Sequence, residues 1–193
     1  MSTHPSHDSL RTVLHALELG GLGATLGGSG LMYAHGLIAD VRDWDVLVDA
    51  DRAVVEAALT AANLTWQDAE NASTQPTAGT LLVVTEGDVE INVLVNFGIH
   101  PEGADPSATA VRIPALPSGT WDDIPLGSLE AWLVAYRLMA LTPRANDIAR
   151  HLRHHGANCI HAQRLLAEPL PEEIRAEISA FLESEPHSGH HGP

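Results

Sequence analysis

The spacing of hydrophobic positions predicts helices near both ends of the chain. Between residues 8 and 19, apolar side chains recur every three or four positions, as in an amphipathic helix. The residues that carry this repeat are Leu10, Val13, Leu14 and Leu17. Asp8 or Ser9 can cap this helix. Gly20-Gly21 can end it. Similar patterns predict helices over residues 128–141, 143–155 and 171–182.

Short apolar and β-branched stretches predict strands in the first two-thirds of the chain. They cover residues 24–26, 44–48, 80–85, 89–95 and 111–113. Glu86-Gly87-Asp88 joins two of these stretches and favours a hairpin turn. Two further helices are expected between the strands, at residues 29–36 with Ser29 as the cap and at 51–62 with Asp51 as the cap. The polar segments 68–78 and 98–110 are expected to be loops.

Together these elements predict an α+β fold, in which a mixed β-sheet is flanked by helices and followed by a C-terminal helical region. We expect an α/β core over residues 8–120 and the helical region over residues 121–184. The polar ends, residues 1–7 and 185–193, are expected to be flexible tails. The sequence contains no internal repeat.

The composition narrows the class of protein. Hydrophobic residues make up 45% of the 193 residues, which is enough for a sizeable core. No apolar run approaches the roughly 18 residues that span a bilayer, and the N-terminus lacks the pattern of a secretory signal. Cys159 is the only cysteine, so an internal disulfide is excluded. These features favour a cytoplasmic protein without a membrane anchor.

The charge of the chain bears on its partners. With 25 acidic and 10 basic residues, the formal net charge is −15. A nucleic acid would meet net repulsion, because binding to phosphate backbones depends on clustered basic side chains. The only dense basic segment is residues 144–153. We therefore expect a small-molecule or protein partner.

The candidate chemistry lies in Gly27-Gly28-Ser29 and in the nearby Asp43-Trp44-Asp45. A small turn of this kind can bring backbone N–H groups close to a phosphate. Asp43 and Asp45 are two positions apart in a predicted strand, so their side chains share a face and Trp44 turns to the core. Carboxylate oxygens are ligands that Mg²⁺ prefers.

A third carboxylate on a neighbouring strand would complete such a site and can serve as general base. Glu90, flanked by Val89 and Ile91, offers this carboxylate, and Asn92 lies on the same face of its strand. In the simpler alternative, Glu90 and Asn92 face solvent on a half-exposed strand.

At these residues the chain resembles the nucleotidyltransferase superfamily, most closely the small bacterial branch that includes antibiotic-modifying and toxin-type members. The matching positions are Gly27, Gly28, His35, Gly36, Asp43, Asp45 and the segment 144–147, with Glu90 in the third-carboxylate position. The resemblance implies transfer of a nucleoside monophosphate from a nucleoside triphosphate to a hydroxyl of a small molecule or protein. It also implies a Mg²⁺ cofactor, with Mn²⁺ as the alternative.

The resemblance further assigns roles to individual residues. Asp43, Asp45 and Glu90 are expected to bind metal and to act in catalysis. The residues expected to contact the nucleotide are Gly27, Gly28, Ser29 and Arg42.

Other positions depart from the family pattern. Ala39 and Val41 stand where the family commonly has Arg and Thr, and Asn146 stands where Lys is usual. The chain therefore offers fewer positively charged side chains to a triphosphate than the family pattern does. The alternative hypothesis is a catalytically degenerate nucleotidyltransferase fold used for binding or regulation, of the toxin–antitoxin type.

Histidines near the C-terminus suggest a separate metal hypothesis. His151 and His155 are four residues apart and can share a helix face. Zinc would need further ligands, such as Cys159 or His161. A solvated helix end is the simpler interpretation.

Overall fold

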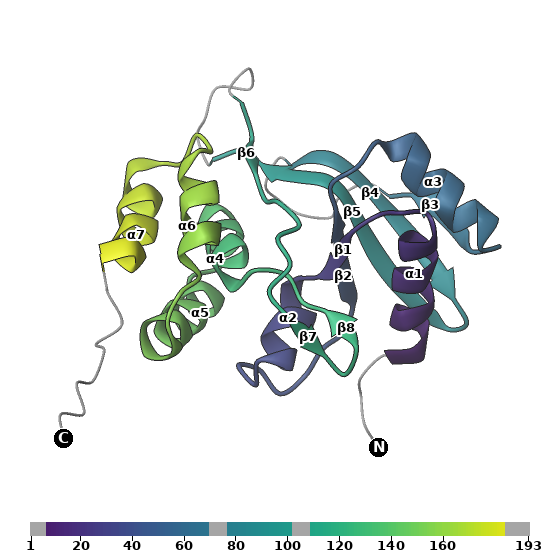
Figure 1. Ribbon diagram of the computed structural model, residues 1–193, viewed down its shortest axis with the longest axis horizontal. Helices are drawn as coiled ribbons and strands as arrows, with labels where there is room; N and C mark the ends of the chain where they lie inside the picture. Colours follow the sequence, from purple (N-terminus) through teal and green to yellow (C-terminus); the bar gives the residue numbers. More distant parts are fainter. Residues whose placement is uncertain (1–6, 70–76, 102–108, 184–193) are drawn as a thin grey trace, which may run out of the picture.

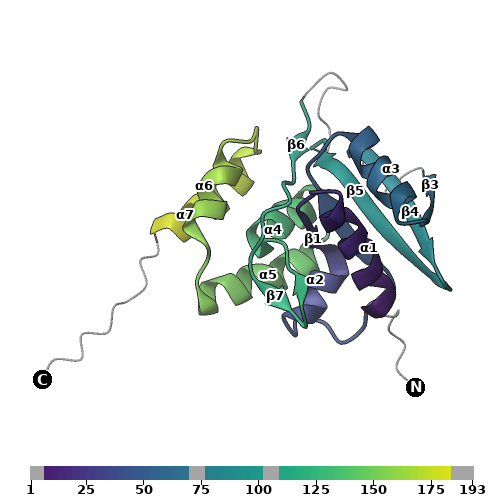
Figure 2. The same cartoon turned by 45° about the vertical axis from the view of Figure 1, so that its right-hand side comes forward.

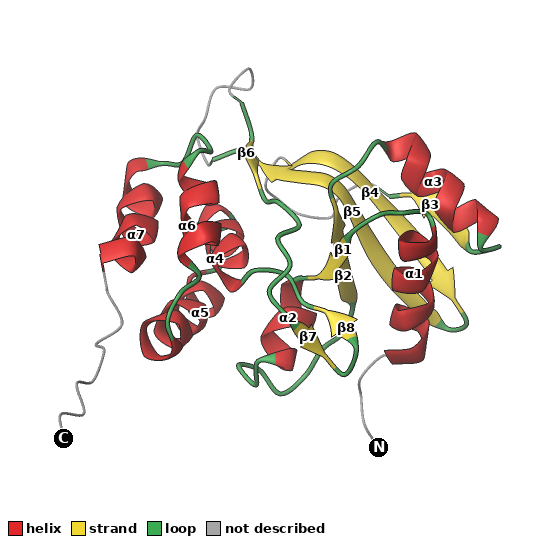
Figure 3. Cartoon of the chain, viewed as in Figure 1, coloured by secondary structure: helices red, strands yellow, loops and turns green. Residues whose placement is uncertain are grey.

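The computed structural model describes residues 7–69, 77–101 and 109–183. The predicted tails lie almost entirely outside these residues, as do parts of the two predicted loops. Within them the α+β expectation is confirmed, because a mixed sheet is flanked by helices (Figure 1, Figure 3). None of the helices in this described part is long and apolar enough to cross a membrane.

The strands form one large sheet and one small hairpin. They are β1 Ala24–Leu26, β2 Trp44–Val48, β3 Thr65–Asp68, β4 Thr77–Glu86, β5 Val89–Ile99, β6 Val111–Arg112, β7 Thr120–Trp121 and β8 Ile124–Pro125. The large sheet has the order β1-β2-β5-β4-β3, with β6 added against the end of β5. Among the strands of the described residues, only the central pair β2–β5 is parallel. The pair β7–β8 stands apart as a two-stranded sheet.

The helices are divided between the two sides of the sheet. They are α1 His7–Leu19, α2 Gly28–Ala34, α3 Arg52–Ala61, α4 Leu129–Leu138, α5 Thr142–His155, α6 Cys159–Leu166 and α7 Glu172–Glu183. Helices α1 and α3 lie together on one side, whereas α4 to α7 gather on the other (Figure 1, Figure 2). The sheet therefore has one face turned toward the C-terminal helices.

The pattern of buried side chains along β2 explains why this strand lies at the centre of the sheet. Trp44, Val46 and Val48 alternate along the strand and are fully buried. The ring of His7, in α1, lies 5.4 Å from the Trp44 ring, so this face packs against α1. Asp45 points to the opposite face, as the alternation of strand side chains predicts.

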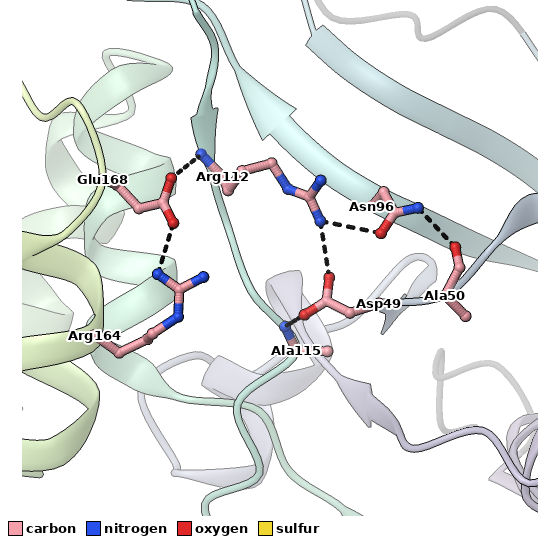
Figure 4. A network of polar contacts seen from close by, with 7 residues as sticks. All are labelled: Asp49, Ala50, Asn96, Arg112, Ala115, Arg164 and Glu168. Atoms are coloured by element: carbon pink, nitrogen blue, oxygen red, sulfur yellow. Dashed lines mark hydrogen bonds and ion pairs between the residues drawn. The ribbon is translucent and has the colours of Figure 1, made fainter.

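A polar network connects the C-terminal helices with the end of β2 and β5 (Figure 4). The Arg112 guanidinium donates to Asp49 Oδ1 at 3.2 Å and to Asn96 Oδ1 at 3.1 Å. The backbone N–H of Arg112 donates to Glu168, which also accepts from Arg164. Strand β6 is thus held between the sheet and the segment that links α6 to α7.

Some elements differ from the prediction. Gly27 is the N-cap of α2, so Ser29 lies inside this helix and does not cap it. Asp51 occupies the N-cap of α3 without a side-chain hydrogen bond. The hairpin strands β4 and β5 extend further than predicted. The elements not predicted from the sequence are β3, β7, β8 and α6.

Candidate active site

The two carboxylates of the Asp-Trp-Asp segment lie at the start of β2. Asp45 belongs to the strand, is half-buried and faces the C-terminal helices, whereas Asp43 is an exposed residue just before the strand. Trp44, between them, is completely buried. The prediction that Trp44 turns to the core is therefore confirmed.

The Gly-Gly turn packs directly against Asp45. The Gly27 N–H donates to the Asp45 carbonyl oxygen at 2.7 Å. Gly28 has φ +54°, and a Cβ atom at this position would lie 1.9 Å from Asp45 Oδ2. Only glycine combines this conformation with such a close approach. The buried Ser29 hydroxyl lies 3.5 Å from Asp43 Oδ1, so the turn contacts both carboxylates.

The parallel register of β2 and β5 places Asn92 directly beside Asp45. Asn92 Nδ2 donates a hydrogen bond to Asp45 Oδ1 at 3.0 Å. Glu90 lies two positions earlier on β5, is exposed, and is paired with Thr85 of β4. The position across from Asp45 thus carries an amide, and the role predicted for Glu90 stays a prediction.

Asp43 and Asp45 are the residues of this site that could hold a metal ion. Within the described residues, no group of three or more His, Cys, Asp or Glu side chains is placed to hold a metal ion. Asp43, Asp45 and Glu90 therefore form no three-carboxylate cradle here. Mg²⁺ is commonly held by one or two carboxylates together with substrate phosphates and waters, and Asp43 and Asp45 meet that requirement.

The protonation of Asp45 is set by its surroundings. Burial raises its pKa to about 6, because the protein replaces water around the charged form. The Asn92 hydrogen bond opposes this rise, nearby Asp43 adds to it, and Arg144 opposes it. Asp45 is therefore ionised at neutral pH and becomes protonated in mild acid.

Helices α4 and α5 supply the other wall of a cleft at Asp45. The cleft has a volume of about 180 Å³, and its lining includes Asn92, Trp132, Tyr136 and Arg144. The Arg144 guanidinium lies over the Tyr136 ring, 5.6 Å from its centroid. Trp132 packs on the turn so closely that a Cβ atom at Gly27 would lie 2.3 Å from its ring.

The remaining predicted residue, Arg42, is exposed in the segment between α2 and β2. Its contact with a nucleotide stays a prediction. A larger cavity of about 480 Å³ lies between α1, β1 and the β7–β8 hairpin, and neither Asp43 nor Asp45 lines it. We therefore place the candidate site at the smaller cleft, which is lined by Arg144 and by Asp45, the carboxylate that packs against the turn.

Three residues of this cleft had no assigned role in the sequence analysis. Asn92 was recognised only as a neighbour of Glu90, and Arg144 only as part of the basic segment and of the segment 144–147 that matches the family pattern. Tyr136 lies in a predicted helix, near the position where the family usually has Lys. Tyr136 comes four residues after Trp132, so the two side chains share a face of α4. Their contact could therefore have been predicted from the sequence.

The histidines form a different arrangement from the zinc site considered above. His151 lies 4.3 Å from His155 and 5.3 Å from His35, measured between ring centroids. The zinc hypothesis is wrong for the described structure, which has no metal-holding group of three such ligands. Instead, the three imidazoles connect the end of α2 with α5.

Comparisons with known proteins identify the fold. No protein-family model and no curated protein sequence matches the chain. The solution structure of the antibiotic-resistance factor ANT(2'')-Ia is similar with a TM-score of 0.50 and 16% identity, over 96% of this chain and 97% of that one. Its crystal structure in complex with adenylyl-2''-tobramycin gives 0.51 and 15%, over 92% and 98%.

A protein from Thermotoga maritima described as a nucleotidyltransferase gives a TM-score of 0.53 and 15% identity, over 78% of this chain and 97% of that one. The chain therefore has the nucleotidyltransferase fold, and the resemblance inferred from the sequence is confirmed at the level of the fold.

Proposed function

We propose that the protein is a metal-dependent nucleotidyltransferase that moves a nucleoside monophosphate from a nucleoside triphosphate to a hydroxyl of a small molecule or protein. The observation that carries this proposal is the contact of the Gly27–Ser29 turn with Asp43 and Asp45, beside a cleft that contains Arg144. It is supported by the fold, which ANT(2'')-Ia shares.

In the proposed reaction, an acceptor oxygen forms a bond to the α-phosphorus and the bond to the bridging oxygen of pyrophosphate breaks. The acceptor proton passes to a base, for which Glu90 is the predicted residue. Asp43 and Asp45 would hold Mg²⁺, which neutralises charge on the phosphate oxygens when bound. The backbone N–H groups of Gly28 and Ser29 would orient the phosphates.

The test is pyrophosphate release by the full chain with Mg²⁺, each of the four nucleoside triphosphates and a panel of hydroxylated acceptors, including aminoglycosides. Asp45→Asn removes a proposed metal ligand, and Asp88→Asn, in the exposed β4–β5 turn, is the matched control. The proposal expects release that Asp45→Asn abolishes and Asp88→Asn leaves intact. Release unchanged in Asp45→Asn would contradict it.

Asn92 favours a second candidate function. Its amide cannot accept a proton or supply a third carboxylate, although it lies across from Asp45 at 3.0 Å. The corresponding proposal is a nucleotide-binding regulatory protein without turnover. It expects nucleotide binding without pyrophosphate release in the wild type, and stronger Mg²⁺ binding in the nearly isosteric Asn92→Asp. Robust turnover by the wild type would exclude it.

A further inference from the structure

The cavity between α1, β1 and the β7–β8 hairpin has no role in the proposed function. Its volume of about 480 Å³ lies in the range of roughly 300–1,000 Å³ that is typical of small-molecule sites. Its walls are joined to one another, since α1 contacts β1 and β1 contacts β8 (Figure 1). Arg11 of α1 also donates to the Asp122 carbonyl oxygen, in the hairpin turn, at 2.9 Å. The cavity is therefore a preformed part of the fold.

Most of the cavity surface is apolar. Leu14 supplies the side of α1, Leu22 and Ala24 supply the segment that enters β1, and Pro117 and Pro125 lie on the side of the hairpin. Leu14 and Ala24 are buried in the hydrophobic core, so this lining is held in place. An apolar ligand body would gain free energy by leaving water for such a surface.

Thr25 of β1 adds a polar group to this lining. Its side chain is 3% exposed, and its hydroxyl oxygen has no hydrogen-bond partner among the described residues. Buried hydroxyls are normally paired, because leaving one unpaired costs free energy of folding. A ligand that enters the cavity can supply the missing partner.

The charged side chains around the cavity favour a cation. Glu18 and Asp123 line it and are exposed. Arg11 also lines it, but this guanidinium already pairs with Asp8 and Asp122. These four carboxylates outnumber the one guanidinium, so the rim attracts a positively charged group.

We propose that this cavity binds a small organic amine with an apolar body. The apolar body would contact Leu14 and Pro125, and a hydrogen-bonding group on it would pair with the Thr25 hydroxyl. The ammonium group would face Glu18 and Asp123 at the rim. The ligand would thus use each of the three properties of the cavity, namely its apolar walls, its unpaired hydroxyl and its negative charge.

This site is separate from the candidate active site. Neither Asp43 nor Asp45 lines the cavity, so the bound amine would not be the group that reacts. Thr25 lies two residues before Gly27. The bound amine would therefore contact the strand that leads directly into the active-site turn.

The test is a titration of the full chain with tryptamine, followed in amide NMR spectra at pH 8, where an ordinary imidazole is neutral. This pH keeps His15 from adding positive charge, since its Nδ1 atom lies on the rim 3.6 Å from Glu18. Indolepropionate has the same ring with a carboxylate, and ethylamine has the amine without the ring. Tryptamine should shift the amide signals of Leu14 and Thr25 saturably at millimolar concentration, whereas neither control should do so.

Variants of the lining test the individual contacts. Thr25→Val is nearly isosteric and should weaken tryptamine binding about fivefold, because it removes one hydrogen bond. Thr85→Val, on the exposed face of β4, is the matched control and should leave the affinity unchanged. Asp123→Asn should weaken binding about twofold, as expected for one exposed charge. Since the Thr25 hydroxyl is unpaired, Thr25→Val should keep or raise the melting temperature, which separates lost binding from lost folding.

Three results would overturn the proposal. The first is the absence of saturable tryptamine binding by the wild type, and the second is equal affinity for tryptamine and indolepropionate. The third is a set of shifted signals confined to Asn92 and Tyr136, which would place the amine in the cleft of the candidate active site.

The amine site and the proposed function fail separately, because the titration contains neither nucleotide nor metal. Tryptamine binding at Thr25 without pyrophosphate release in the transferase assay would leave the amine site standing and contradict the transferase. Pyrophosphate release that Asp45→Asn abolishes, together with no tryptamine binding, would do the reverse.

Discussion

At the scale of single residues, Asp45 is the side chain on which most of the proposed chemistry depends. Its two carboxylate oxygens meet different neighbours, since Oδ1 accepts from Asn92 and Oδ2 lies against Gly28. It is half-buried, so keeping it ionised at neutral pH costs stability of the folded state. A residue retained at such a cost is typical of a functional site.

Asp45→Asn should stabilise the unliganded protein at pH 7.5 by about 1–2 kcal/mol. The pKa of Asp45 is raised to about 6 from an ordinary value of 3.8. The neutral form therefore stabilises the fold fully below pH 3.8, and this contribution is lost as pH rises through 6. Urea unfolding at pH 7.5 and pH 4 measures the difference, which should disappear at the lower pH. Equal stability of both proteins at pH 7.5 would contradict the prediction.

Gly28→Ala should destabilise the protein by at least about 2 kcal/mol, because it combines backbone strain with a clash. Its Cβ atom would meet Asp45 Oδ2 at 1.9 Å, and its φ is +54°. Gly36 provides the control, since its φ is +68° and nothing lies within 4 Å of an added Cβ atom. Gly36→Ala should cost only the strain, about 1 kcal/mol. Chemical denaturation of both variants compares these values, and equal losses would argue against the clash.

At the scale of elements, three imidazoles in edge-on and tilted contact connect the end of α2 with α5. His35 follows α2, and His151 and His155 belong to α5. Burial lowers the pKa of His35 and is the largest effect on it. The neighbouring His151 and His155 lower this pKa further, whereas Glu130 of α4 raises it. Burial also lowers the pKa of His151, with His155 and His154 adding to the effect. The neutral forms of His35 and His151 are therefore favoured in the folded protein.

The stability of the protein should therefore contain a histidine contribution that falls in mild acid. A lowered pKa means that this contribution is complete above the ordinary value of 6.5 and decreases as pH falls below it. His35→Gln should reduce the loss of stability between pH 7 and pH 5.5 in urea unfolding. His15→Gln, on the exposed side of α1, is the control and should retain the wild-type loss. An unchanged loss in His35→Gln would exclude this role.

Elements with regular patterns were predicted well from the sequence, and elements defined by distant contacts were not. The repeat in α1 and the alternation in β2 are local, so their positions were confirmed within a few residues. Strand β3 is a polar edge strand without such a pattern. The β7–β8 turn uses Asp122 and Asp123 with positive φ, where Gly or Asn is the usual signal.

The candidate site was also predicted well only where local patterns were enough. Alternation along a strand placed Trp44 and Asp45 on opposite faces of β2 correctly, because it depends only on neighbouring residues. Whether Glu90 or Asn92 lies beside Asp45 depends on the register of two parallel strands that are far apart in the chain. The sequence pattern is compatible with either residue, so the prediction of Glu90 could not be resolved without the fold.

At the scale of the whole molecule, the Arg112 network couples the sheet to the C-terminal helices. The Arg112 side chain donates hydrogen bonds to Asp49 and Asn96, which lie in or next to the strands of the sheet. Its backbone N–H donates to Glu168, which lies between α6 and α7 (Figure 4). The Arg112–Asp49 pair is partly exposed, so its Coulomb attraction is weakened by solvent. The contribution of Arg112 should therefore come mainly from its hydrogen bonds to Asp49 and Asn96.

Arg112→Ala should lower stability by about 1 kcal/mol, from the lost hydrogen bonds to Asp49 and Asn96. Arg150→Ala is the control, because Arg150 is 74% exposed and pairs with Asp147 one turn earlier on α5, so its loss should cost less than about 0.5 kcal/mol. Guanidinium unfolding followed by tryptophan fluorescence compares the two variants. Equal losses of stability in the two variants would show that the hydrogen bonds of Arg112 contribute no more than an exposed ion pair does.

The contact of Gly27 with Trp132 has a consequence for the evolution of this chain. The indole occupies the space that any larger side chain at position 27 would need. Lineages that exchange this glycine should also carry a smaller side chain at position 132, so the two positions should vary together in relatives. The same reasoning predicts genetic suppression, in which Trp132→Leu restores folding to Gly27→Ala although each change alone is harmful.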